Sequence, residues 1–299
     1  MSEHDHLSSS ALALLELPDS ERIRAIYVDR FIYHERVNSI LAECDYLTSR
    51  PAGLRPRGLL VSGSSGSGKS MLAEAIFRRH VASEANSERA ATLPVMLISM
   101  SNAHDAKEIF TRMLQVLKCP NIGSMTGDER RTMALQIARA AQLKLLIVDE
   151  LQDLLHTTAR QRALTLVAVK DVMNSLLVPT VALGTQDARI ALEADQHLKA
   201  RFRFRDLPRW QADDYLRHFL EAMESSFPLK RRSNLGSLTL MRLIVKATAG
   251  LTHDIVERLQ NAAGLAVESG EERITSSLFE RAEFEFPVLA LPKGAHEHG

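Results

Sequence analysis

The feature that most constrains the fold is a glycine-rich octapeptide that directly follows a short apolar run. Residues 59–61 are Leu-Leu-Val, which is typical of a buried strand, and the octapeptide reads Gly63-Ser64-Ser65-Gly66-Ser67-Gly68-Lys69-Ser70. The spacing of apolar residues after it predicts an amphipathic helix. A glycine-serine linker is the alternative interpretation, but a linker would not be flanked by a buried strand and such a helix. The order strand, loop, helix therefore predicts a phosphate cradle.

The residue types of this loop suit a nucleoside triphosphate. Backbone N–H groups surround an anion only where side chains do not block the approach, which explains Gly63, Gly66 and Gly68. Lys69 is placed to reach the β- and γ-phosphates, and Ser70 to ligate magnesium. The helix that starts after the loop directs its positive N-terminal end toward the anion. We therefore expect a P-loop that binds ATP with Mg²⁺.

Apolar runs of strand length recur along the first two thirds of the chain and alternate with helical segments. They occupy residues 59–61, 95–98, 145–148 and 180–183, and a fifth short strand is expected at 202–205. This alternation predicts an α/β fold in which helices cover both faces of a parallel sheet. Beyond Pro208 the strand signals stop, and four helices are expected at 213–224, 237–248, 254–268 and 276–283.

These elements suggest four parts. We expect a helical lead-in over residues 1–50, of which 17–47 read as helix, and a nucleotide-binding core over 51–208. A small helical lid would cover 209–286, and a loosely ordered tail 287–299.

Composition limits the partners and the compartment. Lys plus Arg equal Asp plus Glu at 37 each, so contacts with nucleic acid would have to come from local patches. The two cysteines, Cys44 and Cys119, have no partner at metal-ligand spacing, which indicates a reducing compartment. The N-terminus is polar, and no apolar run reaches the length of a signal or membrane segment, so we expect a cytoplasmic protein without membrane contact.

A second acidic site follows the apolar run 145–148. Asp149 would orient magnesium, and Glu150 would polarise the attacking water. An acidic pair that caps the following helix is the alternative, but it would not explain the P-loop upstream. Because a hydrolase needs a residue that activates water, Glu150 favours an ATPase over a small-molecule kinase.

Two further candidates come from the ends of later strands. Thr185 follows the run 180–183 and could sense the γ-phosphate or the water, or cap the next helix, and the two roles could coexist. Arg201 could reach the γ-phosphate of a neighbouring subunit, with Arg203 and Arg205 as competitors. A solvated basic strand is the alternative for all three arginines.

The P-loop, the Asp-Glu strand, the Gly184-Thr185 strand end, Leu198-x-x-Arg201-Phe202 and a helical C-terminal domain, in that order, resemble an AAA+ ATPase with its lid. Several segments more narrowly resemble the TniB family of ATP-dependent transposition regulators related to TnsC. These segments are Leu17-Pro18-x-x-Glu21-Arg22-Ile23, Asp29-Arg30-Phe31-Ile32-Tyr33, Val148-Asp149-Glu150-Leu151-Gln152-Asp153-Leu154-Leu155, Gly184-Thr185-x-Asp187-Ala188, Pro208-x-Trp210 and Ala266-Val267-Glu268-Ser269-Gly270.

This resemblance implies an ATPase that assembles on double-stranded target DNA as a homo-oligomer, a ring or a filament, and recruits or activates a transposase. Hydrolysis would then disassemble the complex. The octapeptide would bind phosphate, Asp149 and Glu150 would serve magnesium and hydrolysis, Thr185 would be sensor 1, and Arg201 the arginine finger. The region around Ile32 and Tyr33 would lie by the adenine.

Some features depart from the pattern or stay open. Where many AAA+ lids carry a basic sensor 2 residue, this chain offers only His253, which also reads as a helix-start residue. DNA contacts are expected from residues 101–112, with Lys107 and Arg112, or from Lys230-Arg231-Arg232, although each patch could be a solvated surface. The alternatives are an AAA+ ATPase with another client, such as a helicase loader or a signalling switch, and a module that binds nucleotide without hydrolysis.

Overall fold

The computed structural model describes residues 4–51, 53, 55–80, 91–103, 105, 107–155 and 158–288. The chain divides into two compact units. One unit spans Arg36–Pro208, and the other combines Met1–Glu35 with Arg209–Gly299. We refer to them as the α/β unit and the helical unit.

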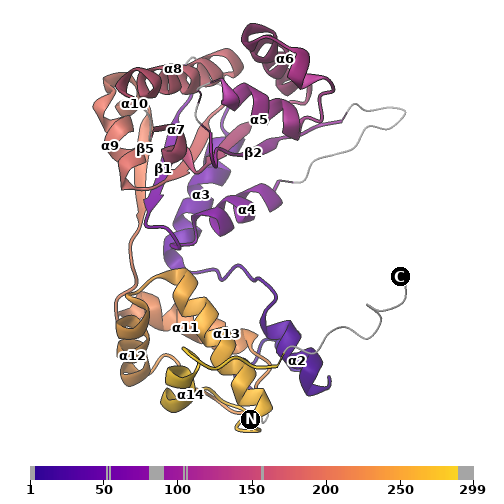
Figure 1. Ribbon diagram of the computed structural model, residues 1–299, viewed down its shortest axis with the longest axis vertical. Coiled ribbons are helices and arrows are strands. Elements are labelled where there is room, and N and C mark those ends of the chain that lie inside the picture. Colours follow the sequence, from indigo (N-terminus) through magenta and orange to yellow (C-terminus); the bar gives the residue numbers. More distant parts are fainter. Residues whose placement is uncertain are drawn as a thin grey trace. The chain divides into compact units, whose positions relative to one another are not determined.

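The α/β unit is built on a five-stranded parallel sheet, as predicted (Figure 1). The strand order is β2-β3-β4-β1-β5. The strands are β1 (Gly58–Gly63), β2 (Val95–Ser99), β3 (Leu145–Asp149), β4 (Thr180–Gly184) and β5 (Phe202–Leu207). All residues of β3 and β4 are buried, because helices cover both faces of the sheet.

The helices of this unit alternate with the strands along the chain. They are α3 (Glu35–Ser49), α4 (Lys69–Arg78), α5 (Glu108–Val116), the short 3-10 turn η1 (Ile122–Ser124), α6 (Gly127–Ala140), α7 (Leu151–Leu155), α8 (Ala159–Leu176), α9 (Gln186–Ala194) and α10 (Gln196–Lys199). Helices α6 and α8 each begin with a capping box, from Thr126 and Thr158, which fixes where these helices start.

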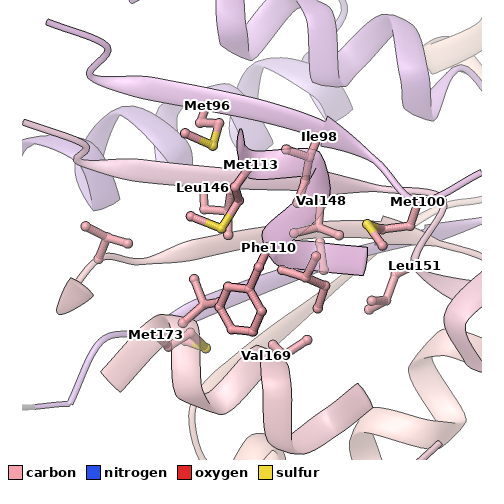
Figure 2. Packing of buried hydrophobic residues seen from close by; sticks show 14 of the residues in the cluster. Met96, Ile98, Met100, Phe110, Met113, Leu146, Val148, Leu151, Val169 and Met173 are labelled. Atoms are coloured by element: carbon pink, nitrogen blue, oxygen red, sulfur yellow. The ribbon is translucent and has the colours of Figure 1, made fainter. Parts of the chain in front are cut away.

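One face of the sheet carries a methionine-rich apolar core. Met96 and Ile98 of β2 and Leu146 and Val148 of β3 project toward α5 and α8 (Figure 2). Phe110, Met113, Val169 and Met173 from these helices fill the space between. This packing holds β2 and β3 in place within the sheet, and it thereby positions the residues at their carboxyl ends.

The strand order decides which loops meet. β4 lies between β1 and β3, with Ser62 paired to Gly184 and Val148 paired to Ala182. Since all three strands are parallel, the loops that follow them open at the same edge of the sheet. Residues far apart in the sequence are brought together there.

The helical unit contains α1 (Ser9–Leu14), α2 (Asp19–Ile26), α11 (Asp214–Ser226), α12 (Leu238–Thr248), α13 (Thr252–Glu268) and α14 (Ser276–Arg281). Its apolar core includes Trp210, which stacks on Phe219 at 4.7 Å between ring centroids. The Trp210 indole also donates a hydrogen bond to Thr252 Oγ1 at 3.0 Å. Most of the predicted tail lies outside the described residues, but the Pro287 ring occupies the space that a side chain at Gly264 would take.

No helix in the described part of the chain is long and apolar enough to cross a bilayer.

The N-terminal region differs from the prediction. The expected helix over residues 17–47 is wrong, because the chain is not helical between the end of α2 at Ile26 and the start of α3 at Glu35. In this interval the Arg30 guanidinium donates to the carbonyls of Ala25 and Ser226, and the aromatic and β-branched residues there have low helix propensity. Residues up to Glu35 also pack with the C-terminal helices instead of leading into the core.

A buried ion pair holds the N-terminal segment in the helical unit. Arg22 of α2 is 1% exposed and donates two hydrogen bonds to the Glu272 carboxylate, at 2.9 and 2.5 Å. It also donates to the Pro228 carbonyl at 2.7 Å and to Asp19 at 2.9 Å. Burial alone would raise the pKa of Glu272, but the hydrogen bonds from Arg22 and the Lys230 backbone outweigh it and lower this pKa.

We predict that Arg22→Met lowers the free energy of unfolding of the helical unit by about 3 kcal/mol, because it removes the buried counter-charge of Glu272 and leaves only the more exposed Lys230 ammonium, at 3.2 Å, to compensate the carboxylate. Thermal and urea unfolding followed by circular dichroism would measure this. Arg24→Met, in the same helix, is the matched control, since that side chain is only half-buried.

The same ion pair predicts a pH dependence. Because the folded-state pKa of Glu272 is depressed, its stabilisation is present above the ordinary value near 4.5 and is lost as the pH falls through the folded value. The difference in unfolding free energy between wild type and Arg22→Met should therefore shrink below about pH 4.5. A difference that stays constant from pH 7 to pH 3 would contradict this assignment.

Candidate nucleotide-binding site

The loop between β1 and α4 needs its glycines. Gly66 and Gly68 have φ angles of +75° and +91°, which side-chain-bearing residues rarely adopt. A Cβ at Gly63 would lie 2.5 Å from Ser67 Oγ and 3.0 Å from the Leu207 carbonyl oxygen. Gly68 is the N-cap of α4, so the loop leads directly into the positive end of a ten-residue helix. The backbone therefore has the form of a cradle that added side chains would fill.

Lys69 is held by this loop. Its side chain is 5% exposed, and Nζ donates hydrogen bonds to the carbonyls of Gly63 at 3.0 Å and Ser64 at 2.8 Å. Burial lowers the pKa of Lys69, and the charges of Glu150 and Asp149 act in the opposite direction. Within the described residues, the hydrogen bonds of this cation go only to neutral carbonyls, so it is placed to receive an anion such as a nucleotide phosphate.

The acidic pair lies at the carboxyl end of β3. Asp149 is buried, and its Oδ1 accepts the N–H of Glu150 at 2.9 Å. Glu150 has φ +57°, a left-handed conformation that costs on the order of 1–3 kcal/mol and is concentrated at functional sites. The Asp149 carboxylate and the exposed Ser70 hydroxyl are hard oxygen donors, the type that Mg²⁺ prefers. These residues fit the magnesium ion that a triphosphate brings with it.

Thr185 follows β4 and occupies the N-cap position of α9. Its side chain makes no capping bond, and Oγ1 is buried without a hydrogen-bond partner within the described part of the chain. Leaving a hydroxyl buried and unpaired costs about 1–3 kcal/mol. The structure therefore does not contain the capping bond that the sequence offered as an alternative, and the hydroxyl is left for a ligand.

Gln152 also belongs to the site, although the sequence predicted no role for it. Its side chain is 7% exposed and lies between Glu150 and Thr185. Its amide nitrogen donates to the Glu150 carboxylate, and its amide oxygen accepts the Thr185 N–H at 3.2 Å. The only signal in the sequence was a lone amide in the apolar turn Leu151-Gln152-Asp153-Leu154-Leu155.

The candidate arginines lie in different surroundings. Arg201 immediately precedes β5, and its carbonyl accepts the N–H of Gly58, the first residue of β1. The P-loop follows the other end of β1, about 16 Å away at roughly 3.3 Å per residue, so Arg201 does not serve the P-loop of its own chain. Its guanidinium donates to Asn174 at 2.6 Å, whereas Arg203 and Arg205 both pair with Glu43, at 3.0 and 2.9 Å.

Two predicted contacts fall in the helical unit. Tyr33 is 57% exposed and meets Phe31 edge-to-face at 5.1 Å, and its contact with adenine stays a prediction. His253, near the start of α13, lies 3.6 Å from the Glu257 carboxylate one turn later, as expected for a residue at a helix start.

Two of the basic residues considered for DNA contacts, Arg112 and Lys230, have partners within the protein. Lys107 directly precedes α5, and Arg112 donates to the Ser101 carbonyl at 3.3 Å and lies 3.6 Å from Glu108. Lys230 lies 3.2 Å from the Glu272 carboxylate that pairs with Arg22. A DNA role for Lys107 and Arg112 stays a prediction.

We predict that Gly63→Ala weakens nucleotide binding by about tenfold or more, because the added methyl group overlaps Ser67 and the backbone of Leu207. Titration with a fluorescent ATP analogue would measure the affinity. Gly123→Ala is the matched control, since nothing lies within 4 Å of a Cβ there. Equal affinity in the Gly63 variant and the control would show that the loop is not the binding site.

Comparisons with known proteins place the chain in a family. The family model for the bacterial TniB protein matches residues 22–212, which is more than half of the chain. No curated protein matches the chain.

Among solved structures, the chain is similar to the Aeropyrum pernix ORC2 protein with ADPNP and ADP, at 17% identity over 87% of this chain and 70% of that one, with a TM-score of 0.63. The Aeropyrum pernix ORC1 protein in complex with DNA is 18% identical over 87% of this chain and 68% of that one, with a TM-score of 0.63. Pyrobaculum aerophilum Cdc6p is 15% identical over 91% of this chain and 72% of that one, with a TM-score of 0.61. At these identities the likeness concerns the fold alone. The chain has the fold of an AAA+ ATPase with a helical lid, and it belongs to the TniB family.

Proposed function

We propose that this chain is an ATPase that binds and hydrolyses ATP with Mg²⁺ and acts on double-stranded DNA in transposition. The observation that carries the proposal is the meeting of three groups at one edge of the sheet. The P-loop follows β1, Thr185 follows β4, and Asp149 ends β3 with Glu150 directly after it, so the groups come from three neighbouring strands. Membership of the TniB family supports the link to transposition.

Each residue has a separate part in the proposed reaction. The loop from Gly63 to Ser70 presents backbone N–H groups to the phosphates, and Lys69 neutralises charge on the β- and γ-phosphates. Glu150 orients and polarises the attacking water, and the free Thr185 hydroxyl binds the γ-phosphate or that water. The magnesium ion, held by Ser70 and Asp149, supplies charge neutralisation when it is bound. In this scheme residues 51–208 form the core, 209–286 the lid, and Tyr33 lies by the adenine.

Arg201 completes the site only between subunits. It lies at the amino edge of the sheet, and the P-loop lies at the carboxyl edge. A contact that joins these two different edges is heterologous, and repeating it generates a ring or a helical filament. We therefore propose a homo-oligomer in which Arg201 of one copy stabilises the γ-phosphate held by the next.

Such an oligomer would bind DNA despite a formal net charge of zero. A few phosphate contacts per subunit, repeated around the duplex, multiply into tight binding. The residues we propose for these contacts are Lys107, directly before α5, and Arg112, within α5. The Aeropyrum pernix ORC1 structure, which has a similar fold, contains DNA. The assembled protein would then recruit or activate a transposase.

The first test is ATP hydrolysis by the purified protein with and without double-stranded DNA, together with electron microscopy of the ATP-bound mixture. We expect DNA to stimulate turnover, and rings or filaments to form on DNA. Lys69→Ala should abolish nucleotide binding and assembly, because it removes the buried cation of the loop. Glu150→Gln should retain ATP and accumulate as a DNA-bound oligomer, because only water activation is lost.

The two variants separate binding from hydrolysis. Equal loss of assembly in Lys69→Ala and Glu150→Gln would contradict the scheme in which ATP binding drives assembly. Turnover by a monomer that DNA does not stimulate would leave the ATPase intact but remove its action on DNA.

A mixing experiment tests Arg201. Arg201→Ala alone should lose most hydrolysis, whereas Lys199→Ala, an exposed cation two residues earlier, should keep wild-type turnover. An equal mixture of Arg201→Ala and Glu150→Gln should recover up to about a quarter of wild-type turnover, because about that share of interfaces joins an intact site to an intact arginine. If the mixture shows no recovery while each variant still assembles, Arg201 does not act between subunits.

A further inference from the structure

Gln152 links two groups of the site through one side chain. Its amide nitrogen donates to the Glu150 carboxylate, and its amide oxygen accepts the Thr185 backbone N–H at 3.2 Å. Glu150 directly follows β3 and Thr185 directly follows β4, so the amide bridges the carboxyl ends of two neighbouring strands. A longer contact, 3.4 Å, joins the same nitrogen to Asp153. The side chain is almost completely buried, and both ends of the amide are hydrogen-bonded.

The local backbone is built around this side chain. The left-handed conformation of Glu150 turns the chain from β3 directly into α7, which places Gln152 in the first turn of that helix. On the facing strand, a Cβ at Gly184 would lie 3.1 Å from the Gln152 amide oxygen and 2.8 Å from the Ala188 Cβ. Gly184 therefore leaves the room that the amide occupies.

A side-chain amide meets both demands of this position without a change of protonation. The Glu150 carboxylate accepts hydrogen bonds and needs a donor, whereas the Thr185 N–H needs an acceptor. Leucine has the size but offers neither group, and an ionised glutamate offers no donor. Asparagine has both groups, but its side chain is one methylene shorter and would not span the same two partners.

We propose that Gln152 is a positioning residue that couples Thr185 to the orientation of the Glu150 carboxylate. The inference rests on the proposed ATP hydrolysis and adds a regulatory link to it. One carboxylate oxygen is held by the amide, which leaves the other to face the water. When the Thr185 hydroxyl binds the γ-phosphate, a shift of its backbone moves the amide and with it the carboxylate. Water activation then depends on the presence of the γ-phosphate.

The test compares full-length Gln152→Leu with wild type in steady-state ATP hydrolysis, ATP affinity and thermal unfolding. We expect kcat to fall by about 10- to 100-fold, because misplacing a catalytic group by a fraction of an ångström has effects of this size. The dissociation constant for ATP should stay within about twofold, since within the described residues the hydrogen bonds of the Gln152 side chain go to Glu150, Asp153 and Thr185 and not to the P-loop. Gln115→Leu, an exposed glutamine on α5, is the matched control.

A second variant gives a readout that a purely structural role would not change. In Gln152→Glu the new carboxylate faces Glu150 and Asp153, with Asp149 and Lys69 nearby in the site. When ionised it repels Glu150, and when protonated it donates the missing hydrogen bond. Its kcat relative to wild type should therefore rise as the pH falls, whereas the relative kcat of Gln152→Leu should stay flat.

Each outcome decides the matter. Wild-type kcat in Gln152→Leu overturns the coupling. Parallel loss of ATP affinity and thermal stability, with a flat relative pH profile for Gln152→Glu, assigns the amide a structural role and also overturns it. An inactive wild-type protein is a different result, because there the proposed ATP hydrolysis fails before any variant is compared.

Discussion

The structure of the candidate site depends on one constraint, the parallel pairing of β1, β4 and β3. Parallel strands end at the same edge of a sheet, so the loop after each strand lies beside the loops after its neighbours. Glu150 follows the last residue of the P-loop, Ser70, by 80 residues in the sequence, yet only β4 separates their strands. The apolar packing of β2 and β3 against α5 and α8 holds this edge in register. The chemistry of the site is therefore a consequence of sheet topology.

Buried polar groups distinguish the site from the rest of the molecule. In the helical unit, Arg22 and Glu272 are buried with dense hydrogen bonding, which is the form a structural ion pair takes. At the sheet edge, Lys69 has only carbonyl partners and the Thr185 hydroxyl has none in the described structure. The charges of the ion pair compensate each other within the protein. At the sheet edge, the Lys69 charge and the Thr185 hydroxyl are available to a ligand. This difference supports the assignment of nucleotide binding to the sheet edge.

Local patterns were enough to predict the sheet and the P-loop. Strands buried on both faces appear as continuous apolar runs, and the glycines of the loop are required by its backbone conformation. The break between α2 and α3 could not be predicted, because Arg30 donates a hydrogen bond to the carbonyl of Ser226, which is almost 200 residues away in the sequence. Gln152 was missed for a related reason, since its two partners become neighbours only when β3 and β4 pair.

The structure also separates the three arginines that the sequence left as competitors. Glu43, largely buried, neutralises both Arg203 and Arg205, and withdrawing either cation would leave a buried carboxylate with less compensation. Arg201 is held by a neutral amide on Asn174, so moving it onto a phosphate leaves no charge unpaired. Its place at the amino edge also separates it from the P-loop of its own chain, so under the proposed function the phosphate that it meets would belong to another copy. Under the proposed function, the same side chain thus makes hydrolysis dependent on assembly.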